Sequence, residues 1–477
     1  MPIKPLKAAK EVLSHDSRLD AAASETISYL MDLLYYGDFR IFQQVASADE
    51  FEYVNLVGAK GPSKGKKPLW LISTVATGHL PEPSLWQRGG GDGLKPFFDE
   101  EMGVLYGLGA AGGKIDFVCK VLAASSFSSE ELNRPLYVIG LFGEEARATG
   151  LRSVLDLSGG EGGTALVSAP TNLALWKSHP GLVALRIEIN RELRHRRMPP
   201  MRGIFKLKIS GKSAHAQWPG LGKNALDRGL EVLSELRGAG DIRVLSISTD
   251  PGANRIPGRC ELIVATSYES MIPFRDDVVV EELGDGVSVP FPIDGLLDAW
   301  TRAKGAINDA RSDLQGLSQS KRLRTGRNVH FGELISDRDS IAGTVSFWVD
   351  KRGDAMDIAR KVAAAVQGAL PKGSNLDVAI QVIQDRPAFA RDSESTDFLS
   401  VAKSALDAQG IAPIVAGGRV TTDAGLLESE GIESYAFGPG SSGAQLYRDD
   451  EGIPAAHIEA TYRFYVDLIR RWCLKPR

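Results

Sequence analysis

Apolar residues recur along this chain with two periods, and each period predicts a different kind of element. Residues 24–36 and 224–238 place apolar side chains at helical spacing and predict amphipathic helices. Residues 204–210 (IFKLKIS) alternate apolar and polar side chains, which predicts a strand with one solvated face. Short continuous apolar runs at 68–74 and 136–142 are typical of strands buried on both faces. The pattern therefore predicts a protein of mixed helices and strands.

The order of these elements favours an α/β fold in the first part of the chain. A predicted helix at residues 114–122 leads into the strand at 136–142, and such alternation is typical of a mostly parallel sheet flanked by helices. Residues 51–57 and 68–74 are two predicted strands joined by the polar loop 61–67, so we expect a hairpin-like start to the sheet.

From Gly203 the pattern changes to that of a second, α+β region. Its predicted helices and strands follow one another at residues 204–210, 224–238, 243–248, 260–267, 330–336 and 343–352, before a helix that ends at Ala369. Residues 269–327 lack this patterning and are interpreted as an insertion.

Length and composition fit a chain of two or more domains. The 477 residues are 43% hydrophobic, which is enough to build large cores. Lys and Arg together number 56 and Asp and Glu 60, so the net charge of -4 gives no reason to expect nucleic acid or a membrane as a partner.

The cysteines and the apolar runs bear on the compartment. Cys119, Cys260 and Cys473 are too far apart for a CxxC motif, which fits a reducing compartment. The first residues lack the apolar segment of an export signal, and no run approaches the length of a membrane span. We therefore expect a cytoplasmic protein.

Two adjacent acids, Glu144 and Glu145, follow the predicted strand at 136–142. Open α/β sheets bind ligands at the carboxyl ends of their strands, where a general base next to a metal-ligating carboxylate would be needed. The alternative is structural, because acids also favour the first turn of a helix.

Eight segments carry further motifs, among them LFGEEARATG, GKSAHAQWP and FGPGSSG. In chain order they are residues 69–86, 95–116, 141–150, 168–172, 211–225, 254–258, 421–427 and 437–451. Together they resemble the metallopeptidase family of acetylornithine deacetylase, succinyl-diaminopimelate desuccinylase and aminoacylase. The resemblance implies a discontinuous catalytic-type domain of residues 1–202 and 389–477, and a lid domain of residues 203–388 enlarged by the insertion. In this family the lid commonly dimerises, so the resemblance implies a homodimer unless the enlarged lid replaces the partner.

The resemblance also implies a site for two zinc ions, but most of its ligand positions carry other residues. The His and its orienting Asp in the first motif correspond to Thr74 and Ala76, and His79 is interpreted as a loop residue without the carboxylate that would orient it. The positions of the bridging Asp, the next acid and the closing His correspond to Gly112, Ala169 and Tyr447. Zinc prefers about four N, S or O ligands, and Glu145 alone remains. We therefore predict no bound zinc and no other cofactor.

Other positions of the family's site are kept. Glu144 matches the general base and His215 the lid histidine that contacts the scissile carbonyl. The substrate-binding positions correspond to Asn254, Arg352, Gly438 and Gly440, although spacing alone places the lid arginine on Tyr268. Glu144, His215 and Asn254 each also have a structural interpretation, as a helix cap or a turn residue.

Three functions stay open. The first is a pseudoenzyme that binds a small amide or acyl-amino-acid-like ligand or a protein partner. The second is a metal-independent amide hydrolase or acyl-transfer enzyme that uses Glu144 and His215. The third is a conventional metal-dependent amidohydrolase whose ligands lie elsewhere. Metal content separates the third from the others, and turnover in the presence of a chelator separates the second.

Overall fold

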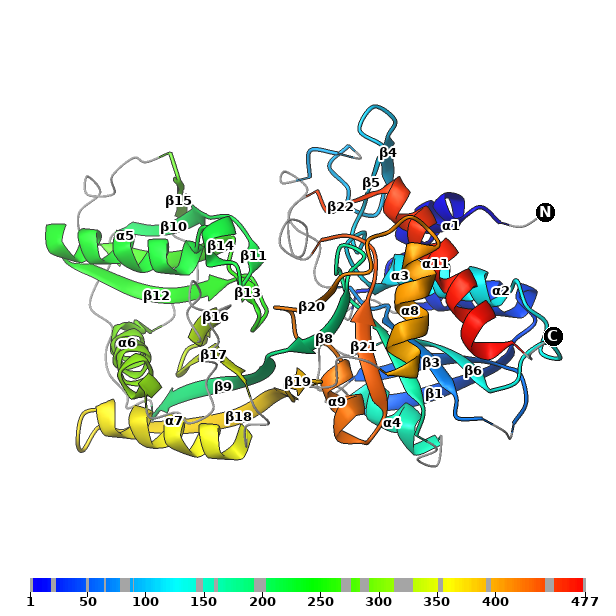
Figure 1. The fold of residues 1–477 in the computed structure, drawn as a ribbon. Helices are drawn as coiled ribbons and strands as arrows, with labels where there is room; N and C mark the ends of the chain where they lie inside the picture. Colours follow the sequence, from blue (N-terminus) through cyan, green and yellow to red (C-terminus); the bar gives the residue numbers. More distant parts are fainter. Residues whose placement is uncertain are drawn as a thin grey trace. The chain divides into compact units, whose positions relative to one another are not determined.

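The computed structural model divides the chain into two compact units, residues 1–181 with 386–477 and residues 182–385 (Figure 1). It describes residues 3–18, 23–48, 51–63, 66–77, 86–88, 90–142, 149–157, 162–192, 203–266, 276–283, 291–312, 329–350, 355–391, 396–441 and 450–474. No helix within these ranges is long and apolar enough to cross a membrane.

The first unit is built on a mixed sheet with parallel strands at its centre. In the described residues the strand order is β1 (Arg40–Ala48), β2 (Phe51–Lys60), β6 (Leu136–Leu141), β3 (Leu69–Thr74), β7 (Thr164–Ser168), β21 (Glu433–Phe437), β8 (Leu175–His179) and β19 (Phe389–Ala390), with β20 (Val415–Gly417) beside β8. Strands β6, β3, β7 and β21 run parallel, so their carboxyl ends meet at one edge of the sheet.

Helices cover both faces of this sheet, which is why its central strands are continuously apolar. Leu69 and Leu71 of β3 belong to one buried cluster, while Trp70 and Ile72 belong to another on the opposite face. The first cluster includes residues of α1 (Pro5–Leu13), α2 (Ser24–Tyr36), α3 (Gly113–Ala124), α8 (Asp397–Asp407) and α11 (Ala455–Cys473). The second includes residues of α4 (Thr149–Leu157) and α9 (Ala424–Ser429). A small sheet of β22 (Gly452–Pro454), β5 (Val104–Tyr106) and β4 (Phe97–Asp99) completes the described part of the unit.

The start of the sheet differs from the prediction. Strand β2 pairs with β1 and β6, whereas β3 lies between β6 and β7. The predicted hairpin of residues 51–57 and 68–74 is therefore wrong, and the hairpin is formed by β1 and β2. The sequence around β1 (RIFQQVASA) lies at the edge of the sheet, where exposed Phe42 and Val45 obscure the alternation that would have predicted a strand.

The second unit is an antiparallel sheet packed on helices. In the described residues the strand order is β15 (Val278–Leu283), β10 (Gly203–Ser210), β14 (Arg259–Thr266), β12 (Ile242–Thr249), β16 (Val329–Ser336), β17 (Ser340–Val349), β9 (Gly181–Arg191) and β18 (Leu376–Arg386). One buried cluster joins the inner face of this sheet to α5 (Ala225–Ala239), α6 (Asp294–Asp309) and α7 (Ala355–Ala369). The fold class predicted from the sequence, an α/β domain plus an α+β lid, is confirmed.

Two details of the domain organisation emerge from these strands. Strand β9 is part of the second sheet, so the contacts divide the chain at residues 181 and 386, where the sequence pattern suggested 202 and 389. Helix α6 lies within the segment interpreted as an insertion, yet its Trp300 is buried in the core of the second unit. That segment therefore contributes to the core.

Candidate functional site

The carboxyl edge of the first sheet is closed by short backbone links. The amide of Thr74 at the end of β3 donates to Ser168 Oγ at the end of β7 over 3.2 Å. The amide of Ala169 donates to the carbonyl of Phe437 at the end of β21, also over 3.2 Å. A Cβ at Gly113 would overlap the carbonyl oxygen of Thr74, so only glycine lets α3 begin directly against these strand ends.

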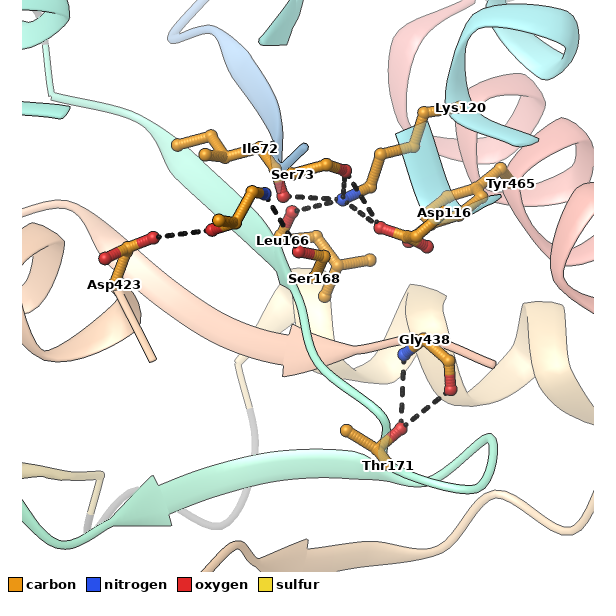
Figure 2. A network of polar contacts seen from close by, with 11 residues as sticks. Ile72, Ser73, Asp116, Lys120, Leu166, Ser168, Thr171, Asp423, Gly438 and Tyr465 are labelled. Atoms are coloured by element: carbon orange, nitrogen blue, oxygen red, sulfur yellow. Dashed lines mark hydrogen bonds and ion pairs between the residues drawn. The ribbon is translucent and has the colours of Figure 1, made fainter. Parts of the chain in front are cut away.

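A buried lysine donates hydrogen bonds to two of the strands that end at this edge (Figure 2). The side chain of Lys120, on α3, is 0% exposed and its Nζ is 2.6 Å from Asp116 Oδ2, whose side chain is 1% exposed. The same ammonium also donates to the oxygens of Ile72 (2.7 Å), Ser73 (3.0 Å) and Leu166 (3.3 Å). Burial lowers the pKa of Lys120, and the charge of Asp116 opposes that shift. The ammonium thus joins β3 to β7.

The carboxylate of Asp116 is fully engaged as well. It accepts hydrogen bonds from Ser73 Oγ over 3.0 Å and from the hydroxyl of Tyr465, on α11, over 2.8 Å. Burial, together with the neighbouring Asp116, raises the pKa of Tyr465 well above its usual value, so the phenol keeps its proton and acts as a donor. Because Lys120 and Asp116 pair with each other, this network presents no unpaired charge to the ends of the strands.

Sequence reasoning missed this ion pair. The signal was present, because Asp116 and Lys120 are opposite charges four residues apart in a helix whose other residues are mostly apolar. Such a pair is usually a solvated contact on a helix surface, and nothing in the sequence alone shows that this one is buried.

A second polar group lies beside Thr74. Its hydroxyl donates weakly to Asp423 Oδ2 over 3.5 Å, and Arg386 donates to Asp423 Oδ1 over 3.2 Å. His179 is buried nearby, and burial lowers its pKa to about 4, so the ring is neutral. Its Nδ1–H donates to the carbonyl of Pro180 over 3.0 Å, while its Nε2 accepts from the amide of Thr422 over 3.3 Å.

The two glycines predicted to bind substrate lie in a tight turn after β21. Thr171 Oγ1 accepts from the amide of Gly438 and donates to its carbonyl, over 3.2 and 3.1 Å. The carbonyl of Gly440 accepts from the amide of Asn172 over 2.7 Å, and Gly440 has a positive φ of 77°. A Cβ at Gly438 would overlap the carbonyl of Ala169. These contacts account for both glycines structurally, and their role toward a ligand stays a prediction.

Four residues that we predicted at zinc-ligand positions or, for Ala76, at the position of the orienting Asp lie at this same carboxyl edge. Thr74 ends β3, Ala76 follows it, Gly112 precedes α3 and Ala169 follows β7. None of these side chains offers the imidazole, thiolate or carboxylate that zinc prefers. Within the described ranges no three His, Cys, Asp or Glu side chains come together to hold a metal ion. These residues do not fit a dizinc centre.

Several predicted residues lie outside the described ranges. They are His79, Glu144, Glu145, Tyr268, Arg352 and Tyr447. Their proposed roles stay predictions.

In the second unit the structure brings together two residues that are 39 positions apart. His215 belongs to β11 (Ala214–His215), which pairs with β13 (Arg255–Ile256), and Asn254 immediately precedes β13. The side-chain amide of Asn254 lies 3.0 Å from His215 Nε2. Burial, with a smaller contribution from His330, lowers the pKa of His215 to about 3. The imidazole is therefore neutral and acts as a hydrogen-bonding group.

Comparison with known proteins identifies the family. The model of peptidase family M20/M25/M40 matches residues 80–471. The chain belongs to this family. The resemblance inferred from the eight segments is confirmed. Individual relatives include deacylases and peptidases.

The curated relatives match only part of the chain. A probable carboxypeptidase of Trichophyton verrucosum is 26% identical over 149 residues, which are 31% of this chain and 28% of that protein. The acetylornithine deacetylase of Myxococcus xanthus is 27% identical over 235 residues, 45% of this chain and 53% of that protein. The matches thus span between about a quarter and a half of these relatives' lengths.

Solved structures of the family match nearly the whole chain. The di-peptidase Dug1p from Saccharomyces cerevisiae has a TM-score of 0.60 at 11% identity, covering 99% of this chain and 96% of that one. Human carnosine dipeptidase 1 has a TM-score of 0.59 at 13% identity, covering 98% and 97%. At these identities the likeness shows the fold.

Proposed function

We propose that this chain is a zinc-independent member of peptidase family M20/M25/M40 that binds a small N-acyl amino acid or a related amide. The observation that carries the proposal is the set of residues at the carboxyl edge of the first sheet. We assign Thr74, Gly112 and Ala169 to ligand positions of the family and Ala76 to the position of the orienting Asp, and Thr74 hydrogen-bonds to Asp423. A protein without charge at these positions lacks the donors that hold a catalytic cation.

The buried cation of this region does not replace the metal. Lys120 is paired with Asp116 and donates to three further oxygens, so its charge is neutralised within the protein. If no other positive charge reaches this edge, the developing oxyanion of amide hydrolysis would be stabilised by neutral donors alone. Binding is therefore the activity that this arrangement supports best.

The class of ligand follows from the family. The Myxococcus relative is an acetylornithine deacetylase, and several solved relatives are di-peptidases or carboxypeptidases. The substrates that these names imply share an amide bond on the nitrogen or carbonyl of an amino acid. An N-acyl amino acid is the smallest ligand that contains this group.

The first test combines metal content with ligand binding. We expect elemental analysis of the purified full-length protein to find no stoichiometric zinc, because most ligand positions carry Thr, Ala or Gly. Calorimetric titration with a panel of N-acetyl-L-amino acids should give the same affinity with and without a chelator. Two zinc ions per chain, or fast hydrolysis that the chelator abolishes, would return the protein to the metal-dependent class.

A further inference from the structure

The first sheet ends at a long strand that pairs with another strand on one side. Strand β1 stands last in the strand order, and among the described strands it pairs only with β2. That pairing runs without a bulge from Arg40, opposite Ala59, to Ala48, opposite Phe51. The outer side of β1 therefore presents the backbone groups of a regular nine-residue strand, which is a template for pairing with a further strand.

A helix lies beside each face of β1. The side-chain amide of Gln43 donates to Met31 Sδ, on α2, over 2.9 Å. The next side chain, Gln44, points to the opposite face, where its Oε1 accepts from Asn55 Nδ2 over 2.6 Å. Asn55 Nδ2 also donates to the carbonyl of Gly150, on α4, over 3.3 Å. With α2 on one face and α4 on the other, the outer edge is the side of β1 that the described elements leave for a partner.

Exposed apolar side chains lie on β1 and on the helix that precedes it. Phe42 and Val45 of β1 are 51% and 56% exposed, and Tyr35 and Tyr36 at the end of α2 are 72% and 79% exposed. Residues 37–39 join α2 directly to β1. Phe42 and Val45 are three residues apart and so point to opposite faces of the strand. Apolar surface thus flanks the edge on both faces, as at a protein–protein interface.

Charge distinguishes β1 from the edge strands of the second sheet. In the described residues that sheet ends at β15 and β18. Strand β15 carries Glu281 and Glu282, and β18 carries Asp377 and Asp385. Charged residues on an edge strand discourage pairing with another chain. Strand β1 (RIFQQVASA) has its one charged residue, Arg40, at the first position and contains no proline. Its sequence lacks the residues that protect the other two edges.

We infer that β1 pairs antiparallel with β1 of a second copy of this chain, across a two-fold axis at Gln44. Gln44 is the middle residue of the strand, so an axis there pairs all nine residues. Each Arg40 then lies opposite Ala48 of the other copy, and the two arginines are roughly 26 Å apart at opposite ends of the interface. Parallel pairing would bring these like charges together. A two-fold interface needs one self-complementary surface, which this uncharged edge supplies.

The position of Val45 makes this interface testable. The inferred interface lies in the first unit, whereas the family resemblance implies a dimer through the lid. With the axis at Gln44, Val45 of one copy lies opposite Gln43 of the other, and the two copies of Val45 are diagonal neighbours on one face of the joined sheet. Long side chains at diagonal positions reach each other. A charge introduced at position 45 should therefore repel its own counterpart and attract the opposite charge.

The experiment measures the mass of the full-length protein by sedimentation equilibrium at micromolar concentrations. We expect the unaltered protein to have the mass of two chains. Val45→Lys and Val45→Glu should each raise the dissociation constant of the dimer by roughly a hundredfold or more, because like charges then meet at the axis. An equimolar mixture of the two variants should form dimers again. Val279→Lys is the matched control, because Val279 is a 60% exposed valine on the edge strand β15, and it should leave the dissociation constant unchanged.

Three results would contradict this interface. The first is an unaltered protein that is monomeric. The second is a dimer that Val45→Lys leaves intact or that Val279→Lys weakens equally, since another surface would then join the copies. The third is a mixture of Val45→Lys and Val45→Glu that stays monomeric, because the strands would then not meet across Gln44. Ligand binding enters none of these results, so this inference and the proposed function succeed or fail separately.

Discussion

The two units of this protein treat their buried polar groups in opposite ways. In the first unit, Lys120 and Asp116 are almost fully buried and every oxygen or nitrogen of the pair has a partner. In the second unit, Gln217 and Trp348 are also buried, but side-chain polar atoms of both have no partner in the described part of the chain. Burial alone therefore does not show whether a polar group has its hydrogen-bond partners, and the contacts of each atom decide that.

Membership of the family allows this difference to be compared with the predicted site positions in each unit. The described residues that we assign to zinc-ligand positions, Thr74, Gly112 and Ala169, lie in the first unit, where hydrogen bonds link the ends of the strands. In the second unit, the predicted lid residues His215 and Asn254 lie 3.0 Å apart, and Gln217 and Trp348 carry buried polar atoms without a described partner. Under the proposed function, the first unit has lost its cation while the lid groups of the second unit remain.

The largest expected effect is that of breaking the satisfied network. Lys120→Met should lower the free energy of unfolding by about 3–5 kcal/mol, because it leaves the carboxylate of Asp116 buried without a cation. Urea denaturation followed by circular dichroism measures this loss.

The double variant Lys120→Met with Asp116→Asn removes both charges and should recover much of the lost stability. If the single variant costs less than about 1 kcal/mol, water reaches the pair and the network is not the closed structure described here.

A second prediction uses one histidine in each unit. His179 and His215 have pKa values lowered to about 4 and about 3, against about 6.5 in the unfolded chain. Below pH 6.5 the unfolded state therefore binds more protons than the native state, and stability falls as the pH decreases. Each excess proton contributes a slope of about 1.4 kcal/mol per pH unit.

The variants His179→Asn and His215→Asn assign this slope to a unit. Urea unfolding between pH 8 and pH 5 should show a shallower dependence for each variant than for the unaltered protein. An unchanged slope in His215→Asn would mean that His215 takes up no additional proton on unfolding, which would contradict its lowered pKa.

The smallest expected effect concerns Thr74. Its hydroxyl lies 3.5 Å from Asp423, a weak contact, and Asp423 keeps its bond to Arg386. Thr74→Val should therefore cost less than about 1 kcal/mol in thermal or urea unfolding. Arg386→Met serves as the comparison and should cost clearly more, since it leaves a buried carboxylate without its cation. A large loss in Thr74→Val would instead make this hydroxyl a main structural element of the strand ends.

Much of the fold could be predicted because it depends on local patterns. The apolar runs at 68–74 and 136–142 became β3 and β6, and the amphipathic stretch at 224–238 became α5. The order of strands in the sheet could not be predicted in this way, because pairing joins segments that are far apart. The displaced hairpin, formed by β1 and β2, is an example.

The candidate site was also predictable only where it depends on local sequence motifs. The positions of Thr74, Gly112, Ala169, His215 and Asn254 were found from motifs, and the structure places the first three at one sheet edge and brings the last two together. The unpaired polar atoms of Gln217 and Trp348 could not be predicted from motifs. Satisfaction of a buried atom is a property of three-dimensional contacts, and no sequence period reports it.

The two adjacent glycines at the start of α3, Gly112 and Gly113, differ in whether a larger residue could replace them. At Gly113 any side chain would collide with the carbonyl of Thr74. At Gly112 the nearest atom to an added Cβ is the carbonyl oxygen of Gly109, 3.4 Å away, which is ordinary contact. A side chain can thus begin at 112 without moving the backbone, whereas position 113 is restricted to glycine. Of these two neighbouring positions, 112 is therefore the one at which a metal-ligating residue could be introduced by design.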